Sequence, residues 1–380
     1  MGVVSVYIDT EERINRELMR RLRVKSHDFD YHVVAGRGAW SAFQRFPHRD
    51  YSSIFVLTER SLWKRWGTHF LKASQLISPH EVFIPSGENS KSIGMAERVA
   101  ATLLKKSADR RSLLIAFGGG VVGDLGGFVA STYMRGIDYI QVPTTVVAQV
   151  DSAIGGKTAV NVGEMKNLIG TFAPPRLVLA DPVVLKSLPL RTFLSGFYEV
   201  AKHAVLSGPP LFSLMEKAAG NLRPAGDGML DRLLVRAAQV KVDIVNRDEH
   251  ESDLRRLLNL GHTFGHALEE ATGYRRLLHG EAVGWGLLCA VRLGVLLEML
   301  GAKEAERIAA LVRSIGPLPS IRDLAPSKIK RLFPRDKKAV AGQIHWVVPE
   351  KIGKVRMVRD VPIGVAAEAL RSVQQTEAHD

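Results

Sequence analysis

The first half of the chain alternates short apolar runs with longer segments whose apolar residues recur every three or four positions. The runs typical of buried strands are YHVVAG, SIFVLT, EVFIP, SLLIAF and Tyr139–Val142. Between them, SLWKRWGTHFLKA and SIGMAERVAATLLKKS have helical spacing. Alternating strands and helices predict a parallel α/β sheet. The polar segment over residues 11–23, EERINRELMRRLR, is predicted to form a helix ahead of the sheet.

The pattern changes in the proline-rich segment FAPPRLVLADPVVLKSLP. From Leu190 to about Arg313 the spacing predicts helix after helix, interrupted by glycine and proline breaks. A strand-like pair, GQIHWVVP and KVRMVRDV, follows near the end. We therefore predict an α/β domain over residues 1–185 and a helical domain over residues 186–380.

Composition places the chain among globular proteins, because 46% of its 380 residues are hydrophobic and 24% are charged. Its one cysteine, Cys289, lies in an apolar run, so no internal disulfide can form and a reducing cytoplasm is expected. Acidic residues interrupt the N-terminus where a signal peptide needs an apolar core. The apolar segment Ala282–Gly301 contains Arg292 and Glu298, which favours a buried helix over a membrane span.

The net charge of +13 comes from 52 basic and 39 acidic side chains. An excess of this size favours polyanions or small acidic substrates. The basic residues are spread from Arg13 to Arg371 without long runs or interleaved aromatic residues. Nucleic acid is therefore the weaker expectation, and a charge that only keeps the surface soluble is at least as good an interpretation.

A glycine-rich turn follows the apolar run SLLIAF. Glycines at 118, 120 and 123 satisfy GxGxxG, with a strand before them and the helix-like DLGGFVASTYM after them. Such a turn lets backbone N–H groups and a helix N-terminus approach a pyrophosphate. Close helix packing explains the same glycines, so this motif alone leaves both interpretations open.

Polar residues crowd the next stretch in places that a core would not accept. They are Asp151, Lys157, Asn161, Lys166 and Asn167. Loops at the C-terminal edge of a parallel sheet would present them to a ligand. The alternative is that they are solvated loop residues, although lysines beside paired glycines suit a phosphate.

Two histidines, His262 and His266, lie one helical turn apart in RRLLNLGHTFGHALEE. Glu199 and Lys202 in FYEVAKHA, and His279 in LLHGEAVGWG, could complete a metal site with them. A helix with one core histidine and one surface histidine is the better interpretation of the pair when it is taken alone.

Several long blocks in order resemble the signature of 3-dehydroquinate synthase, a family of sugar-phosphate cyclases. They run from about Glu59 to Val347 and include GGGVVGDLGGFVAS, YMRGIDYIQVPTTVVAQVDSAIGGKTAVN, EVAK, RDEHESDLRRLLNLGHTFGHALE, HGEAV and DKKAVAGQI. The resemblance implies a Rossmann-like, NAD-binding α/β N-terminal domain and an all-α C-terminal domain that binds metal and substrate. This division agrees with the boundary drawn from the pattern.

The resemblance also implies an activity. A cytoplasmic homodimer with NAD and zinc or cobalt would convert 3-deoxy-D-arabino-heptulosonate 7-phosphate into 3-dehydroquinate and phosphate, in the shikimate pathway toward aromatic amino acids. The steps would be transient oxidation by NAD, phosphate elimination, re-reduction and intramolecular aldol closure. The partner is a small molecule, not nucleic acid or a membrane.

The metal ligands implied by the resemblance are Glu199, His262 and His279, while His266 would face the substrate. The dinucleotide would contact Glu59, Glu88, Lys91, Gly119, Gly120, Asp124, Thr144, Thr145, Asp151, Lys166 and Asn167. Catalysis and substrate anions would involve Arg135, Asp151, Lys157, Asn167, Lys202, Lys241, Arg255, Asn259, His266, Lys337 and Lys338. The chain departs from the family at Glu59, where aspartate is usual, and at Tyr198, where a small residue is usual.

Three alternatives stay open at this point. A 2-epi-5-epi-valiolone synthase acts on sedoheptulose 7-phosphate, which lacks the carboxylate that the full cationic set would bind. A metal-dependent polyol dehydrogenase of the glycerol dehydrogenase type would accumulate NADH, whereas a cyclase would not. A catalytically silent nucleotide- or polyanion-binding protein would explain the charge but not the candidate ligands.

Overall fold

The structure is a computed structural model that describes residues 19–163, 165–224, 228–333 and 344–376. By their contacts these residues form two compact units, Met1–Leu188 with Pro224–His250, and Pro189–Arg223 with Glu251–Asp380. The segment Pro224–His250, which falls in the predicted helical domain, thus belongs by contact to the first unit. The boundary at residue 185 stays a prediction, because contacts alone do not show which segment folds independently.

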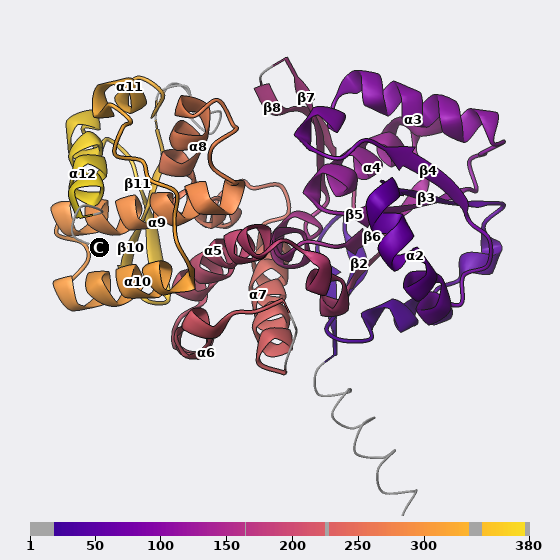
Figure 1. The fold of residues 1–380 in the computed structure, drawn as a ribbon, viewed down its shortest axis with the longest axis horizontal. Helices are drawn as coiled ribbons and strands as arrows, with labels where there is room; N and C mark the ends of the chain where they lie inside the picture. The colour runs from indigo at the N-terminus through magenta and orange to yellow at the C-terminus, as the bar shows by residue number, and fades with distance from the viewer. Residues whose placement is uncertain (1–18, 164, 225–227, 334–343, 377–380) are drawn as a thin grey trace, which may run out of the picture. The chain divides into compact units, whose positions relative to one another are not determined.

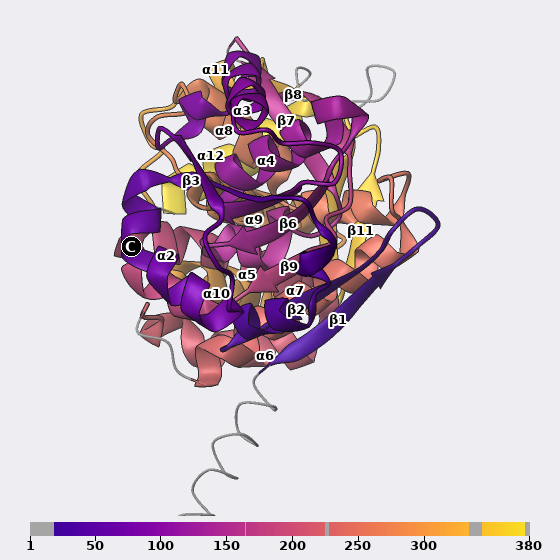
Figure 2. The same ribbon diagram turned by 90° about the vertical axis from the view of Figure 1, so that its right-hand side faces the viewer.

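The first unit contains a seven-stranded sheet in the order β1-β2-β9-β6-β5-β3-β4 (Figures 1 and 2). All neighbouring strands are parallel except β1 and β2, which are antiparallel. The strands are β1 (Arg20–Lys25), β2 (Asp30–Ala35), β3 (Ile54–Glu59), β4 (His80–Ile84), β5 (Leu113–Gly118), β6 (Asp138–Pro143) and β9 (Leu177–Ala180). The predicted parallel α/β sheet is confirmed.

The helix predicted over residues 11–23 is wrong in the part that the structure describes. Residues 20–23 of EERINRELMRRLR belong to strand β1, and residues 11–18 lie outside the described part of the chain. In β1, Leu22 and Val24 are buried while their neighbours are exposed, which is the period of two that a strand requires. The backbone of β1 pairs with β2, and the spacing of polar residues along the sequence does not reveal such a pairing.

Helices cover this sheet and close two apolar cores. They are α2 (Arg60–Ser74), α3 (Ile93–Lys105), α4 (Gly120–Thr132) and α7 (Gly228–Arg247). One core joins side chains of β3, β4 and β5 to α3 and α4. The other joins β1, β2 and β9 to α7 through residues such as Val242 and Val245. The second core is the physical reason why α7 belongs to this unit.

A hairpin projects from the same unit where loops were expected. It consists of β7 (Lys157–Val162) and β8 (Met165–Phe172), paired antiparallel. Thr158 and Val160 are buried while Lys157 is exposed, so one face of β7 packs on α4. A Cβ on Gly127 of α4 would come within 2.4 Å of the Thr158 Cγ2, so glycine permits this close packing.

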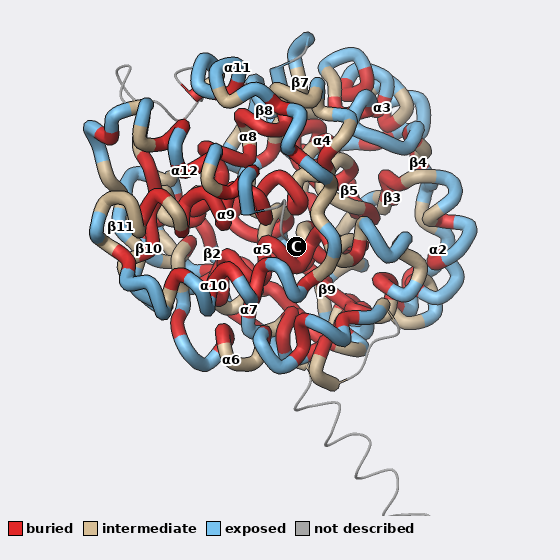
Figure 3. The backbone as a smooth tube through the Cα atoms, turned by 60° about the vertical axis from the view of Figure 1, so that its left-hand side comes forward, coloured by how far each residue is buried: buried red, intermediate tan, exposed pale blue. Residues whose placement is uncertain are grey.

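The second unit is mainly helical and is built around α9 (Figure 3). Its helices are α5 (Leu190–Ser207), α6 (Pro209–Ala218), α8 (His262–Ala271), α9 (His279–Leu296), α10 (Ala302–Ile315), α11 (Pro326–Lys330) and α12 (Ile363–Thr376). The strand-like pair near the end forms β10 (Trp346–Lys351) and β11 (Lys354–Val358), as predicted. Among the described residues, no helix is both long and apolar enough to cross a bilayer, and α9 is the buried helix expected over this segment.

Candidate metal centre and nucleotide-binding turn

Three side chains from three helices of the second unit converge on one point. Glu199 lies inside α5, His262 is the first residue of α8, and His279 is the first residue of α9. The Glu199 Oε1 is 3.2 Å from the His279 Nε2 and 3.6 Å from the His262 Nε2. One oxygen and two ring nitrogens thus lie within 4.8 Å of one another.

This donor set fits a divalent metal. Two ligands about 2.1 Å from a tetrahedral zinc ion lie about 3.4 Å apart, which matches the spacing of these atoms. Three protein ligands leave coordination positions for substrate oxygens. Glu199 is almost fully buried, whereas the His279 side chain is 39% exposed, so the group is accessible from one side.

The second oxygen of Glu199 has a different partner. The Lys202 Nζ is 2.5 Å from the Glu199 Oε2, one helical turn further along α5. Both side chains are about 1% exposed. The carboxylate thus divides its oxygens between an ammonium group and the two imidazoles, and the buried lysine balances its charge.

His279 lies between two carboxylates. Its Nδ1 is 3.3 Å from the Glu269 Oε2 on α8, and its Nε2 faces Glu199. Burial acts to lower the pKa of His279, but the negative charge of Glu269 and the hydrogen bonds to Glu199 and Glu269 outweigh it and raise the pKa to about 10. The two carboxylates thus favour the positively charged form of the ring.

His266, the second histidine of the HxxxH pair, is not among the three residues whose ligand atoms converge. The ring centroids of His262 and His266 are 5.4 Å apart and nearly perpendicular. The three ligand atoms that converge belong to Glu199, His262 and His279. Before this helix, η8 (Leu254–Asn259) carries the buried Arg255 and also Asn259, whose amide donates to the Glu251 carboxylate at 3.0 Å.

Tyr198, beside the glutamate ligand, has a packing role. Its hydroxyl donates to the Gly316 carbonyl at 3.0 Å. A Cβ on Gly284 of α9 would lie 2.7 Å from the tyrosine ring. The tyrosine therefore fills the space that this glycine leaves between α5 and α9.

In the first unit, the glycine turn joins β5 to α4. Gly118 ends β5, Gly119 is the N-cap and Gly120 begins α4. A Cβ on Gly119 would lie 2.9 Å from the Thr145 Cγ2, and the Thr144 N–H donates to the Gly118 carbonyl at 2.9 Å. The structure thus brings Gly119, Gly120, Thr144 and Thr145 together at the carboxyl ends of two neighbouring strands, at a helix N-terminus suited to phosphate.

Other expected dinucleotide contacts lie around this turn in two groups. Lys91, which is buried, donates to the Asp124 carboxylate of α4, and burial raises the pKa of Asp124 although Lys91 opposes that shift. The Asn161 amide bonds Glu88 at 2.8 Å and also accepts from the Asn167 N–H at 2.9 Å. Asn167 has a left-handed backbone with φ 54° and follows Lys166.

Asp151 and Lys241 form a further pair in the first unit. Asp151 lies in the π-helical turn η5 (Ala148–Ser152), and Lys241 extends from α7 to donate to its carboxylate. Glu59 ends β3, and its carboxylate accepts from the Ser86 hydroxyl at 2.5 Å. The longer acidic residue at 59 is therefore still placed at the carboxyl edge of the sheet.

Of four further expected substrate contacts, two lie in the described part of the first unit and two lie outside the described residues. Arg135 follows the C-terminal end of α4, about 20 Å along the helix from Gly120, with a left-handed φ of 70°. Lys157 begins β7 and is exposed. Lys337 and Lys338 lie outside the described residues.

The sequence interpretation missed Glu269. It lies seven residues after His262, so the two side chains share one face of α8 across two turns. A carboxylate at that spacing from a candidate ligand was the signal available in the sequence.

The chain is similar to one family over most of its length. Residues 81–195 match the family described as "3-dehydroquinate synthase N-terminal", and residues 196–339 match "3-dehydroquinate synthase C-terminal". It is 38% identical over 343 residues to a 3-dehydroquinate synthase of Solibacter usitatus, covering 90% of this chain and 96% of that protein.

Solved structures share the fold. A 2-deoxy-scyllo-inosose synthase complexed with carbaglucose-6-phosphate, NAD+ and Co2+ has a TM-score of 0.82 at 22% identity, covering 93% of this chain and 99% of that one. A 2-epi-5-epi-valiolone synthase from Streptomyces hygroscopicus subsp. jinggangensis with NAD+ and Zn2+ bound has a TM-score of 0.81 at 26% identity, with the same coverage.

Proposed function

Because this chain belongs to the 3-dehydroquinate synthase family, we propose that Glu199, His262 and His279 hold the divalent metal of its reaction. The reaction converts 3-deoxy-D-arabino-heptulosonate 7-phosphate into 3-dehydroquinate and phosphate. The observation that carries the metal assignment is the convergence of one carboxylate oxygen and two imidazole nitrogens from three separate helices. Zinc and cobalt both suit this donor set.

The bound cofactors would supply the chemistry that side chains cannot. The metal would act as a Lewis acid on substrate oxygens, and NAD would accept and return a hydride. In our proposal, Gly119, Gly120, Thr144 and Thr145 hold the dinucleotide by backbone and hydroxyl groups at the N-terminus of α4. Support comes from the position of this turn, since Gly119 is the N-cap of α4 at the carboxyl ends of the neighbouring strands β5 and β6.

The protein's own residues would bind and orient the substrate. Most of the candidate residues for this role lie in the second unit, as the proposed metal centre does: Lys202, Arg255, Asn259 and His266. Two further candidates, Lys157 and Lys241, belong to the first unit. A substrate with a carboxylate and a phosphate needs several cationic contacts of this kind. Their role would be to hold one conformer and to balance charge as phosphate leaves.

A phosphate-release assay tests the function. Metal-reconstituted protein with catalytic NAD should release phosphate from 3-deoxy-D-arabino-heptulosonate 7-phosphate and not from sedoheptulose 7-phosphate. Release from sedoheptulose 7-phosphate alone would instead support a valiolone synthase, which is the second candidate because a solved structure of that activity shares the fold. Stoichiometric accumulation of NADH would identify a dehydrogenase.

We also propose that the protein is a homodimer. The β7–β8 hairpin exposes Val162, Met165, Leu168, Ile169 and Phe172 to between 38% and 52%. A row of exposed apolar side chains on one hairpin favours a protein contact. The Thr171 hydroxyl donates to the Ser131 hydroxyl at 2.8 Å, so the hairpin lies beside the end of α4 that precedes Arg135.

We propose the cytoplasm as the compartment. Cys289 is fully buried in α9, and burial raises the pKa of its thiol, so it packs as an apolar residue. A single buried cysteine forms no internal disulfide, which is usual for proteins of reducing compartments.

A further inference from the structure

The imidazole of His279 has a fixed partner on the side away from the proposed metal. Its Nδ1 is 3.3 Å from the Glu269 Oε2, while its Nε2 is 3.2 Å from the Glu199 Oε1. The Glu269 side chain is 4% exposed. We propose that Glu269 is a positioning residue that sets the orientation and tautomer of the ligand His279. This inference rests on the proposed metal function of Glu199, His262 and His279.

Glu269 lies beside the His279 ring because α8 packs closely against α9. A Cβ on Gly286 would lie 1.9 Å from the Gly261 carbonyl oxygen, and a Cβ on Gly265 would lie 3.0 Å from the Ala282 carbonyl oxygen. These contacts advance four residues along α8 as they step back four along α9. The next step of four residues reaches Glu269 and Leu278, and Leu278 directly precedes His279 at the start of α9. The glycines therefore hold the two helices at the distance that this hydrogen bond requires.

The backbone around His279 is held independently of Glu269. Arg191 donates to both oxygens of Glu281 at 2.6 and 2.8 Å and to the Arg276 carbonyl at 2.8 Å. The same Glu281 accepts from the Leu278 N–H at 2.8 Å, which caps the start of α9. These contacts hold the main chain just before His279. Rotation of the ring is the freedom that remains, and a partner at Nδ1 can fix it.

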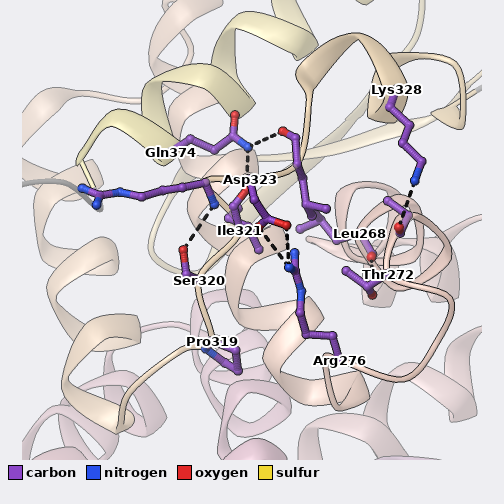
Figure 4. A network of polar contacts seen from close by, with 12 residues as sticks. Leu268, Thr272, Arg276, Pro319, Ser320, Ile321, Asp323, Lys328 and Gln374 are labelled. Atoms are coloured by element: carbon purple, nitrogen blue, oxygen red, sulfur yellow. Dashed lines mark hydrogen bonds and ion pairs between the residues drawn. The ribbon is translucent and has the colours of Figure 1, made fainter.

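A second set of contacts fastens the α8–α9 connection (Figure 4). Arg276 donates to both oxygens of Asp323 at 2.9 and 2.8 Å, and the Gln374 amide donates to the carbonyls of Ile321 and Leu324. Lys328 donates to the Ala271 carbonyl at the end of α8. Loss of Glu269 should therefore release the ring without unfolding the segment that carries it.

Helix stability does not explain a carboxylate at this position. Glu269 lies in the last turn of α8, where the helix dipole disfavours negative charge, and burial adds a desolvation cost. An N–H from Nδ1 to that carboxylate would leave the Nε2 lone pair directed toward the metal position. Partners of this kind fix the tautomer and raise the basicity of metal-binding histidines.

The test is cobalt binding to the metal-free full-length protein, followed by visible absorption and by competition with zinc. Glu269→Ala should weaken cobalt binding about 10- to 100-fold. Glu269→Gln keeps the shape and an acceptor oxygen but loses the charge, so its affinity should fall between wild type and Glu269→Ala. Glu270→Gln removes the same charge one residue further along α8 and should bind cobalt as wild type does. Thermal unfolding of each metal-free variant reports whether it is folded.

The outcomes distinguish a failure of the proposed role of Glu269 from a failure of the proposed metal site. If wild type binds cobalt and both Glu269 variants bind it equally well, Glu269 does not position the ligand. If Glu269→Met, which fills the same space without an acceptor oxygen, binds cobalt as wild type does, the residue only fills space and the inference is overturned. If wild type itself binds no cobalt and Glu199→Gln behaves identically, the metal assignment fails instead.

Discussion

Lys202 approaches Glu199 at the carboxylate oxygen that does not face the histidines, with its Nζ 2.5 Å from the Glu199 Oε2 and both side chains buried on α5. The oxygen directed toward His262 and His279 is thereby left for the proposed metal. Glu199 thus contacts both the buried Lys202 ammonium and the two histidines of the proposed metal site. The stability of this region and its metal affinity should be coupled through that carboxylate.

Lys202→Met tests this coupling. Removing one partner of a buried ion pair typically costs about 3–5 kcal/mol, because the remaining charge loses its counterion. Bound zinc would supply positive charge next to the same carboxylate, so the loss should be smaller in the metal-loaded protein. Urea unfolding of wild type and variant, each with and without zinc, measures both quantities. An equal loss in the two states would contradict the coupling.

Glu199→Gln should abolish activity by removing metal. The neutral amide keeps the shape of the side chain but not the charge that binds a divalent cation, and metal content should fall well below one equivalent. In wild type, a chelator should stop phosphate release and added zinc or cobalt should restore it. Full activity and full metal content in the variant would refute the ligand assignment.

Gly280→Ala should disrupt the metal centre through packing. A Cβ at this position would lie 1.8 Å from the Ser195 carbonyl oxygen, and a main-chain carbonyl on α5 cannot rotate away. We expect about 3 kcal/mol of destabilisation or more, together with loss of metal, since the adjacent His279 would be displaced. Gly364→Ala in α12 is the matched control, because its Cβ would meet no atom within 4 Å. Thermal unfolding and metal content should be unchanged or slightly improved in that control.

Leu168→Lys should weaken the proposed dimer. Leu168 is 52% exposed on the β7–β8 hairpin, so a charge there should leave the subunit folded but make the apolar contact unfavourable. Ile77→Lys is the control, because Ile77 is 87% exposed and lies outside the hairpin. Sedimentation should show monomers for the hairpin variant alone. Identical sedimentation of both variants and wild type would place the interface elsewhere.

Asp181 should make stability depend on pH. Burial raises its pKa to about 6, although the N–H groups of Val183 and Gly38 donate to it and oppose the shift. The folded state therefore holds this proton more tightly than the unfolded chain does. The stabilisation is complete below about pH 4 and is lost as the pH rises through 6, a loss of about 3 kcal/mol at most.

The measurement compares wild type with Asp181→Asn between pH 4 and pH 7. The variant cannot ionise at this position, so its thermal midpoint should fall less over this range than that of wild type. Parallel pH profiles would show that Asp181 has an ordinary pKa in the folded protein.

The repeated strand and helix patterns of the first half were sufficient to predict its parallel sheet, because burial on both faces produces continuous apolar runs such as LLIAFG in β5. Local spacing failed where pairing decided the outcome. Arg20–Lys25 has the polar character of a surface helix, yet it forms a strand against β2 and α7. Lys157–Val162 resembled a ligand loop because half of its residues are polar. Lys157 and Asn161 lie on the outer face of a hairpin strand, whereas Thr158 is buried on the other face.

For the site, the sequence by itself determined which residues could act, since motif blocks identify Glu199, His262 and His279 as candidates without any distance between them. Only the tertiary structure decided which atoms meet. His266 follows His262 by one turn, but the packing of α5, α8 and α9 brings in Glu199 and His279 from other segments. Glu269 gains its role from the antiparallel register of α8 and α9, which glycine contacts fix. The distances between side chains that are far apart in sequence are fixed only when the helices that carry them pack together.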